Sequence, residues 1–191
     1  MKKIILASSS PRRREILKKT GLPFMVDESG YDEDMNSQAE PRSLALKHSA
    51  GKARAVALRH KDALIISADT LVVLNGRIFG KPRNKKEAKD MLRALSGKAH
   101  TVITAYTILE TATGRTLSRM VESRVFFKKL SDGEIATYVK SGEPLDKAGA
   151  YGVQGLGAVI VKRIEGDFFN VMGLPLHSLV QSLVKFGITV L

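Results

Sequence analysis

Short apolar runs alternate along the chain with longer segments in which apolar residues recur at helical spacing. The continuous runs at 4–7 and 63–67 predict buried strands, and the run at 24–26 predicts a further short strand. Helical spacing and capping residues predict helices at 11–20, 41–60, 84–95, 131–142 and 176–186. Segments rich in β-branched and aromatic residues predict strands at 101–109, 117–127 and 159–164.

Two turns and one carboxylate stand out between the predicted strands. The Asn75-Gly76 pair separates the apolar segments 71–74 and 77–79, which predicts a tight β-hairpin. Residues 113–115 predict the turn of a longer antiparallel hairpin. Asp69 follows the apolar run 63–67 almost directly. We therefore expect a carboxylate at the end of a buried strand, where α/β folds place functional groups.

The segment 6–15, Leu-Ala-Ser-Ser-Ser-Pro-Arg-Arg-Arg-Glu, joins the first predicted strand to the first predicted helix. Ser10 is a favourable N-cap residue, and Pro11 suits the first helical position. The free N–H groups at the helix start and the guanidinium groups of Arg12 and Arg13 suit a phosphate or another anion. A capped helix with solvated arginines explains the same residues equally well, so both interpretations stay open here.

Further polar groups occur in four other segments. The segment 27–40 holds six carboxylates, and it either brings a divalent cation to a phosphate site or forms a solvated loop. Lys52 lies among small residues that allow a close approach to a ligand, although a solvated lysine is the commoner case. Lys81 stands in a Gly-Lys-Pro sequence that lacks the spacing and the Ser or Thr of a P-loop. The glycine-rich segment 142–155 combines acceptors, donors and an aromatic ring, and it includes Gln154.

Composition narrows the class of protein. The 191 residues include 31 Lys and Arg against 19 Asp and Glu, a formal charge of +12, which favours a nucleic acid, a nucleotide or an acidic membrane as partner. The absence of cysteine excludes disulfides and thiolate chemistry. The four histidines lack the spacing of a zinc site, and His100 is expected to have a hydrogen-bonded structural role. No apolar run approaches the roughly 20 residues of a membrane span, and no signal peptide is recognisable, so we expect a cytoplasmic protein.

Taken together, these segments resemble the Maf/septum-formation family of nucleoside triphosphate pyrophosphatases over nearly the whole chain. Seven pieces carry the resemblance in the family's order: SSSPRR at 8–13, GKA at 51–53, SADT at 67–70, GKP at 80–82, SGKAH at 96–100, the segment 142–155, and GDFFNVMGLP at 166–175. The resemblance implies an α/β fold with a long mixed sheet, two lobes and a central cleft, related to inosine-triphosphate pyrophosphatases. On this resemblance we expect residues 1–191 to form a single domain, with its two lobes around the cleft.

The resemblance also implies a reaction. Members of the family hydrolyse a nucleoside triphosphate between its α and β phosphates to the monophosphate and pyrophosphate, with a divalent cation such as Mg²⁺ or Mn²⁺. Three positions that separate branches of the family hold Arg13, Thr70 and Gln154 here, which resembles the dTTP/UTP branch rather than the 7-methyl-GTP branch. The implied cellular role is to keep non-standard nucleotides out of nucleic acids, with a link to the arrest of cell division.

The same resemblance assigns roles to residues. Asp69 corresponds to the proton acceptor and metal ligand, and Glu33 to the acidic metal ligand, with Glu40 as an open alternative for Glu33. The charges and hydrogen-bonding groups of the motifs predict further residues that bind the triphosphate and its base. The expected substrate-binding residues are Ser8, Arg12, Arg13, Lys52, Thr70, Lys81 and Gln154.

Two other classes of function remain compatible with the sequence. The net charge suits a nucleic-acid-binding protein, but aromatic residues are 6% of the chain, there is no Trp, and no binding motif appears. We therefore expect no stable nucleic-acid complex and no membrane partner. A protein that regulates cell division without turnover is the second alternative. The family often forms dimers, so the resemblance admits a homodimer.

Overall fold

The computed structural model describes residues 2–33 and 39–191. Its strands are β1 (Lys3–Ala7), β2 (Met25–Val26), β3 (Ala63–Leu74), β4 (Arg77–Phe79), β5 (Ala99–Glu110), β6 (Thr116–Phe127) and β7 (Val161–Glu165). Its α-helices are α1 (Pro11–Lys18), α2 (Pro41–Ala57), α3 (Lys85–Leu95), α4 (Asp132–Lys140), α5 (Phe168–Met172) and α6 (Leu176–Val184). Three 3₁₀ turns follow α4, namely η1 (Glu143–Asp146), η2 (Ala148–Ala150) and η3 (Gly155–Val159).

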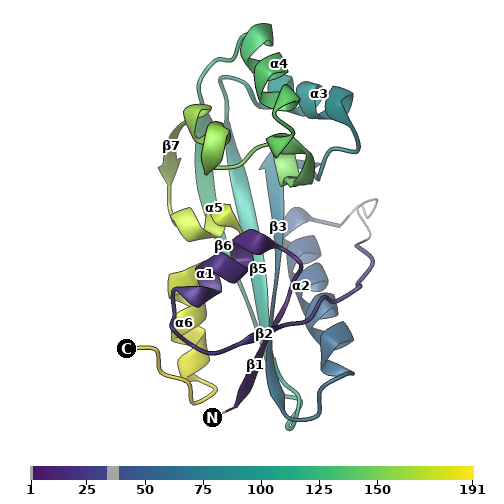
Figure 1. Ribbon diagram of the computed structural model, residues 1–191, viewed down its shortest axis with the longest axis vertical. Coiled ribbons are helices and arrows are strands. Elements are labelled where there is room, and N and C mark those ends of the chain that lie inside the picture. Colours follow the sequence, from purple (N-terminus) through teal and green to yellow (C-terminus); the bar gives the residue numbers. More distant parts are fainter. Residues whose placement is uncertain (1, 34–38) are drawn as a thin grey trace.

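The strands of the described chain form one mixed seven-stranded sheet in the order β2-β1-β3-β5-β6-β7, with β4 paired to β3. β1 is parallel to both β2 and β3, whereas β3, β5, β6 and β7 pair with one another in antiparallel fashion. The long strands β3, β5 and β6 run through both halves of the molecule (Figure 1). The expected α/β fold with a long mixed sheet is confirmed, as are both predicted hairpins.

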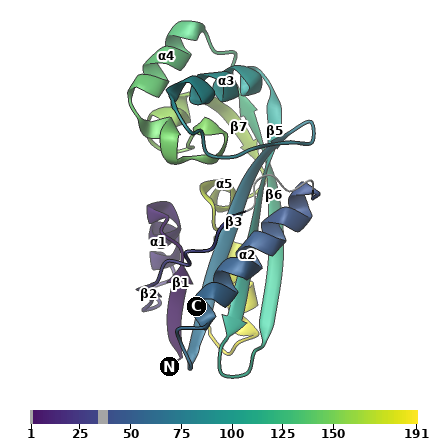
Figure 2. The ribbon, with the colours of Figure 1, turned by 90° about the vertical axis from the view of Figure 1, so that its right-hand side faces the viewer.

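Helices cover the sheet differently in its two halves. In the lower half, α2 packs on one face, while α1 and α6 pack on the other (Figures 1 and 2). Side chains of β1 alternate between these faces, with Ile4 and Leu6 toward α1 and α6, and Ile5 and Ala7 toward α2. In the upper half, α3, α4 and the 3₁₀ turns enclose a separate apolar cluster. Both faces of the strands are therefore buried, which explains the continuous apolar runs.

The position of Asp69 differs from the sequence prediction. β3 continues without a break from Ala63 to Leu74, so Asp69 lies within a strand and not at its end. The parallel pairing to β1 ends at Ala7 opposite Ser67, and the pairing to β4 begins only at Val72. Between these points, β3 pairs with β5 alone. The gap in the sheet, rather than the end of the strand, gives Asp69 its access to a cavity.

Predicted boundaries deviate where the chain changes to tighter turns. The predicted helix 11–20 ends at Lys18, and the predicted helix 41–60 ends at Ala57. The strand predicted at 159–164 begins only at Val161, because η3 extends to Val159. Within the described part of the chain, no helix is long and apolar enough to cross a membrane.

His100 has the structural role that the sequence suggested. Its Nε2 lies 2.7 Å from the hydroxyl of Tyr151, and its ring packs edge-on against the rings of Tyr151 and Phe127. Burial lowers the pKa of His100 to about 4. The imidazole therefore stays neutral in the folded protein at pH values where an unfolded histidine, with a pKa near 6.5, becomes protonated.

We expect this histidine to make stability depend on pH. Between pH 6.5 and pH 4 the unfolded chain binds a proton at His100 and the folded chain does not, so unfolding becomes easier as the pH falls, by about 3 kcal/mol at the lower end. The measurement is urea unfolding of the wild type and of His100→Gln at several pH values in this range. In the variant, the free energy of unfolding should fall less steeply than in the wild type between pH 6.5 and pH 4. Free energies of unfolding that change in parallel with pH in the two proteins would contradict the prediction.

Candidate active site

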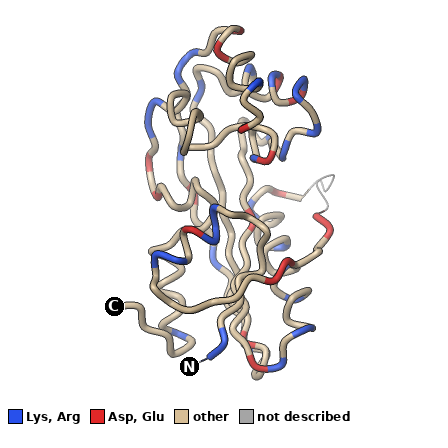
Figure 3. The backbone as a smooth tube through the Cα atoms, viewed as in Figure 1, with Lys and Arg blue, Asp and Glu red and all other residues tan. Residues whose placement is uncertain are grey.

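A cleft of about 1210 Å³ opens beside the unpaired stretch of β3, with residues from both halves of the molecule in its wall. Figure 3 shows basic residues on α1 in the lower half and on α3 in the upper half. The cleft brings together every site residue that the sequence predicted. These are Ser8, Arg12, Arg13, Glu33, Lys52, Asp69, Thr70, Lys81 and Gln154.

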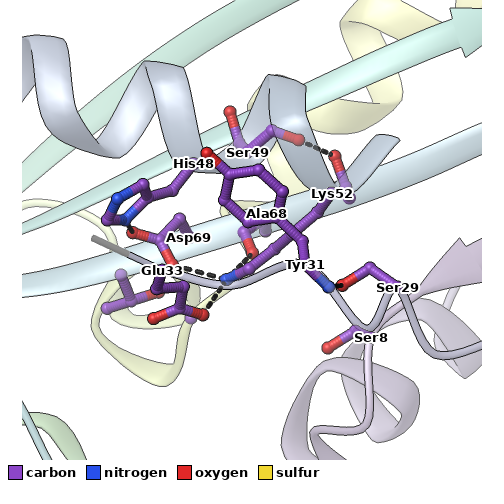
Figure 4. Close-up of polar contacts among 12 residues, drawn as sticks. Ser8, Ser29, Tyr31, Glu33, His48, Ser49, Lys52, Ala68 and Asp69 are labelled. Carbon is purple, nitrogen blue, oxygen red and sulfur yellow. Dashed lines mark hydrogen bonds and ion pairs between the residues drawn. The ribbon is translucent and has the colours of Figure 1, made fainter. Parts of the chain in front are cut away.

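A buried lysine between two carboxylates forms the centre of this cleft (Figure 4). Nζ of Lys52, on α2, lies 2.6 Å from Oδ1 of Asp69 and 2.6 Å from Oε1 of Glu33. Lys52 and Asp69 are 7% and 3% exposed, so this ion pair is shielded from bulk water. Coulomb interactions are stronger in such a low-dielectric environment than at the surface. The two carboxylates are thereby held close together, with only one positive charge between them.

His48 is a member of this cluster that sequence reasoning missed. Its Nδ1 lies 3.3 Å from Oδ2 of Asp69, with the ring misaligned for a regular hydrogen bond, and the side chain is fully buried. A signal was present in the sequence, because His48 precedes Lys52 by four residues and therefore lies one turn away on the same face of α2. The spacing between the four histidines does not reveal this relation.

The electrostatic environment keeps Asp69 ionised. Burial raises the pKa of this carboxyl, but the neighbouring His48 and the charges of Lys52 and Arg13 lower it by more, and its pKa is about 2. The side chain is therefore an anion at neutral pH. The carboxylate can bind a cation. Its pKa rises, and it becomes a better proton acceptor, when the positive charge of a neighbour such as Lys52 moves away.

The donors of this cluster fit a metal ion. One ligand atom each from Glu33, His48 and Asp69 lie within 4.8 Å of one another, and carboxylate oxygens and imidazole nitrogens are ordinary metal ligands. Glu40, the alternative to Glu33, instead caps α2, where its carboxylate accepts hydrogen bonds from the backbone of Arg42 and Ser43. Of the acidic segment 27–40, residues 34–38, including Asp34, lie outside the described residues.

Tyr31 determines how the loop that bears Glu33 approaches α2. The Tyr31 ring packs against Gly51, where an added Cβ would lie 2.3 Å from a ring carbon. Its ring centroid also lies 6.0 Å from that of His48. The small residue next to Lys52 therefore accommodates a side chain of the protein itself. This contact brings Glu33 to Lys52.

The turn before α1 has the geometry that the sequence predicted. The Ser10 side chain accepts a hydrogen bond from the backbone N–H of Arg13, and Pro11 occupies the first turn of the helix. Ser8 Oγ accepts a hydrogen bond from the backbone N–H of Ser10 at 3.2 Å. The turn thus places hydroxyl groups and the positive end of a helix in the wall of the cleft.

The guanidinium group of Arg13 is hydrogen-bonded to other residues of the protein. Its Nε donates to the carbonyl of Gly173 at 2.8 Å, and its two terminal nitrogens donate to Ser8 Oγ and Thr70 Oγ1. Thr70 Oγ1 in turn lies 3.0 Å from Thr104 Oγ1. Burial lowers the pKa of Arg13, although Asp69 and Glu33 oppose this effect. Arg13 and Thr70 therefore act as one hydrogen-bonded unit.

The glycine-rich segment supplies the opposite wall. Glu143 accepts hydrogen bonds from the Tyr138 hydroxyl and from the backbone of Leu156 and Gly157, so it holds the segment together. Arg12 of α1 forms an ion pair with Asp146 at 3.2 Å across the cleft. The side chains of two predicted site residues make no hydrogen bond within the described part of the chain and remain available to a ligand. They are Lys81 and Gln154.

The architecture places the protein among mixed α/β proteins that share a fold with the Ham1 protein of Staphylococcus aureus. That structure superposes with a TM-score of 0.56 over 98% of this chain and 100% of that chain, at 13% sequence identity, so the likeness concerns the fold. A comparison with models of protein families is more specific than this likeness in fold. The chain belongs to the Maf family, because the model of the Maf-like proteins matches residues 3–186.

Curated relatives span the full length of the chain. A protein of Methanosarcina barkeri named dTTP/UTP pyrophosphatase is 49% identical over 100% of this chain and 97% of its own length. A protein of Pelotomaculum thermopropionicum with the same name is 48% identical over 100% of both chains. The family expected from the sequence motifs is therefore confirmed.

Proposed function

We propose that the protein is a nucleoside triphosphate pyrophosphatase that hydrolyses dTTP and UTP to the monophosphate and pyrophosphate. Relatives of this name that match it end to end support the proposal. The observation that carries it is the Glu33–Lys52–Asp69 cluster, in which Lys52 and Asp69 are buried. The cluster faces a cleft whose wall bears further cationic side chains. Such a cleft pairs an activating carboxylate with groups that neutralise phosphate charge.

The chemistry follows from the arrangement of these groups. A bound divalent cation, Mg²⁺ or Mn²⁺, supplies charge neutralisation on the phosphates, and Glu33 and Asp69 would hold it. Asp69 accepts the proton of the attacking water. The water oxygen bonds to the α-phosphorus, and the bond from that phosphorus to the bridging oxygen breaks. Pyrophosphate then leaves with the bonding electron pair.

Lys52 links substrate binding to the basicity of Asp69. In the structure its ammonium group contacts both carboxylates. The triphosphate competes for the same ammonium group. As Lys52 turns toward a phosphate oxygen, Asp69 loses an interaction that lowers its pKa, and it becomes a better proton acceptor at that moment.

Arg12 is proposed to bind the triphosphate, together with Ser8 and Lys81. Its ion pair with Asp146 is exposed on the Asp146 side, so substrate phosphates can displace that carboxylate. Charge-assisted hydrogen bonds of this kind contribute about 1.5–3 kcal/mol. We expect Arg12→Ala to lower kcat/KM for dTTP by about tenfold or more in steady-state assays. Activity within about twofold of the wild type would remove Arg12 from the site.

Base selection is proposed to depend on Gln154 and on the Arg13–Thr70 unit. A uracil or thymine edge presents two carbonyl groups around one N–H, which the amide of Gln154 complements. The test compares pyrophosphate release from dTTP, UTP, CTP, GTP, ITP and 7-methyl-GTP. We expect dTTP and UTP to be preferred and Gln154→Ala to reduce the preference. Equal turnover of GTP and dTTP would contradict this assignment.

The remaining parts of the proposal concern the setting of the reaction. We place the enzyme in the cytoplasm, where it keeps non-standard nucleotides out of nucleic acids, and we propose that it assembles as a homodimer. The cellular role and the dimer follow from the family resemblance, and the location follows from the lack of a recognisable membrane span or signal peptide in the sequence. Sedimentation of the purified protein tests the assembly, and a single species at the mass of one chain would exclude the dimer.

A further inference from the structure

Two buried polar atoms where α2 packs on β3, next to Lys52 and the cleft, lack a hydrogen-bonding partner among the described residues. They are Nδ1 of His48 and Oδ2 of Asp69, and Nε2 of His48 is a third such atom on the same ring. His48 is 0% exposed and Asp69 is 3% exposed. Buried polar groups without partners are rare because they cost free energy, and an ion that binds them is one of the ordinary explanations.

The geometry of this pair is that of two ligands of one ion. Nδ1 of His48 and Oδ2 of Asp69 lie 3.3 Å apart, yet the ring is not aligned for a regular hydrogen bond. Ligand bonds of about 2.1 Å at right angles place two ligand atoms about 3 Å apart. Glu33 supplies a third ligand atom within 4.8 Å of both (Figure 4).

We propose that His48 is a metal ligand, that it completes a site with Glu33 and Asp69, and that this site selects a transition-metal ion over Mg²⁺. The inference rests on the proposed function, because the ion serves the same cleft. Mg²⁺ prefers oxygen ligands and retains several waters, whereas imidazole nitrogen suits Fe²⁺, Ni²⁺, Cu²⁺ and Zn²⁺. A nitrogen ligand therefore changes which ion the site prefers.

Lys52 is compatible with such an ion. Its ammonium group contacts Oδ1 of Asp69, whereas Oδ2 faces His48, so the two oxygens of one carboxylate serve two different cations. Glu33 likewise contacts Lys52 through Oε1 and retains a second oxygen. Oδ2 of Asp69 therefore has no hydrogen-bonding partner among the described residues, although its carboxylate is ionised, and such an oxygen favours a divalent cation.

The direct test is pulsed electron paramagnetic resonance of the wild-type protein with one equivalent of Mn²⁺. Protein labelled with heavy nitrogen in histidine should show a histidine nitrogen coupled to the manganese spin. The coupling should disappear in His48→Leu and persist in His177→Leu, a matched control on the exposed side of α6. Bound Mn²⁺ without nitrogen coupling in the wild type would overturn the proposal, and this result does not depend on the folding of any variant.

Metal affinities provide the second measurement. Calorimetric titration should show that His48→Leu binds Zn²⁺ at least about tenfold more weakly than the wild type, with Mg²⁺ binding changed by less than about threefold. Equal losses for both ions, or none, would contradict a ligand role. Pyrophosphate release from dTTP by the wild type with Mg²⁺ is measured separately. Turnover without nitrogen coupling rejects only the His48 assignment, whereas metal binding without turnover rejects only the proposed function.

Discussion

Asp69→Asn is expected to lower kcat for dTTP by about a hundred- to ten-thousandfold, the range typical for removal of a catalytic acid or base. The amide has nearly the shape of the carboxylate, but it cannot accept the proton of water, and it weakens the attraction for a cation. Because Asp69 lies within β3 and pairs there with β5, the backbone of the variant should stay in place. Steady-state kinetics measure kcat for the wild type and the variant, and circular dichroism checks that the variant is folded.

Asp132→Asn is the matched control for this experiment. Asp132 is an exposed carboxylate that pairs with Arg93 on the upper half of the molecule, outside the cleft. Its loss should leave kcat within about twofold of the wild type, since exposed ion pairs contribute little. If Asp69→Asn retained a tenth or more of the wild-type activity, the role of Asp69 as proton acceptor would be wrong.

Lys52→Met is expected to have the largest effect on stability and a large effect on activity. The change removes the positive charge from the buried carboxylate of Asp69, and leaving a buried charge without its partner costs about 3–5 kcal/mol. Since His48 and Arg13 remain close to Asp69, we expect a loss near 3 kcal/mol at pH 7. The free energy of unfolding from urea titrations provides this value.

The pH dependence of the Lys52→Met effect has a definite sign. The low pKa of Asp69 stabilises the folded wild type above the pKa of an unfolded aspartate, near 3.9, and this contribution disappears as the pH falls toward 2. The difference in the free energy of unfolding between the wild type and Lys52→Met should therefore have its full value at pH 7 and become smaller below pH 4. Lys18→Met, which removes an exposed ammonium group paired with Glu15, should change stability by less than about 0.5 kcal/mol. A difference that is independent of pH would contradict the buried ion pair.

The local features of the site were predictable from the sequence because they depend on neighbouring residues. Ser10 and Pro11 begin a helix wherever they occur in this context, so the turn that holds Ser8 was correctly anticipated. The hairpin at Asn75-Gly76 was predictable for the same reason. The motifs also indicated the family, and with it the set of residues that the cleft brings together.

The features that depend on distant segments were not predictable. Asp69 faces a cavity because β1 stops pairing at Ala7, a fact about another strand that no pattern around Asp69 contains. Glu33 reaches Lys52, whereas Glu40 caps α2, because the loop follows Tyr31 across Gly51. His48 joins the cluster only when α2 packs on the sheet with that face inward. Packing, rather than local propensity, assembled this part of the site.

In the proposed reaction, water attacks the α-phosphorus of dTTP or UTP in this cleft. The most direct test is hydrolysis in water enriched in heavy oxygen, followed by mass spectrometry of the products. We expect one labelled oxygen in the nucleoside monophosphate and unlabelled pyrophosphate, both formed at least about a hundredfold more slowly with Asp69→Asn. Label in pyrophosphate would place the attack on the β-phosphorus, and release of orthophosphate would identify a different reaction. Either result would contradict the mechanism.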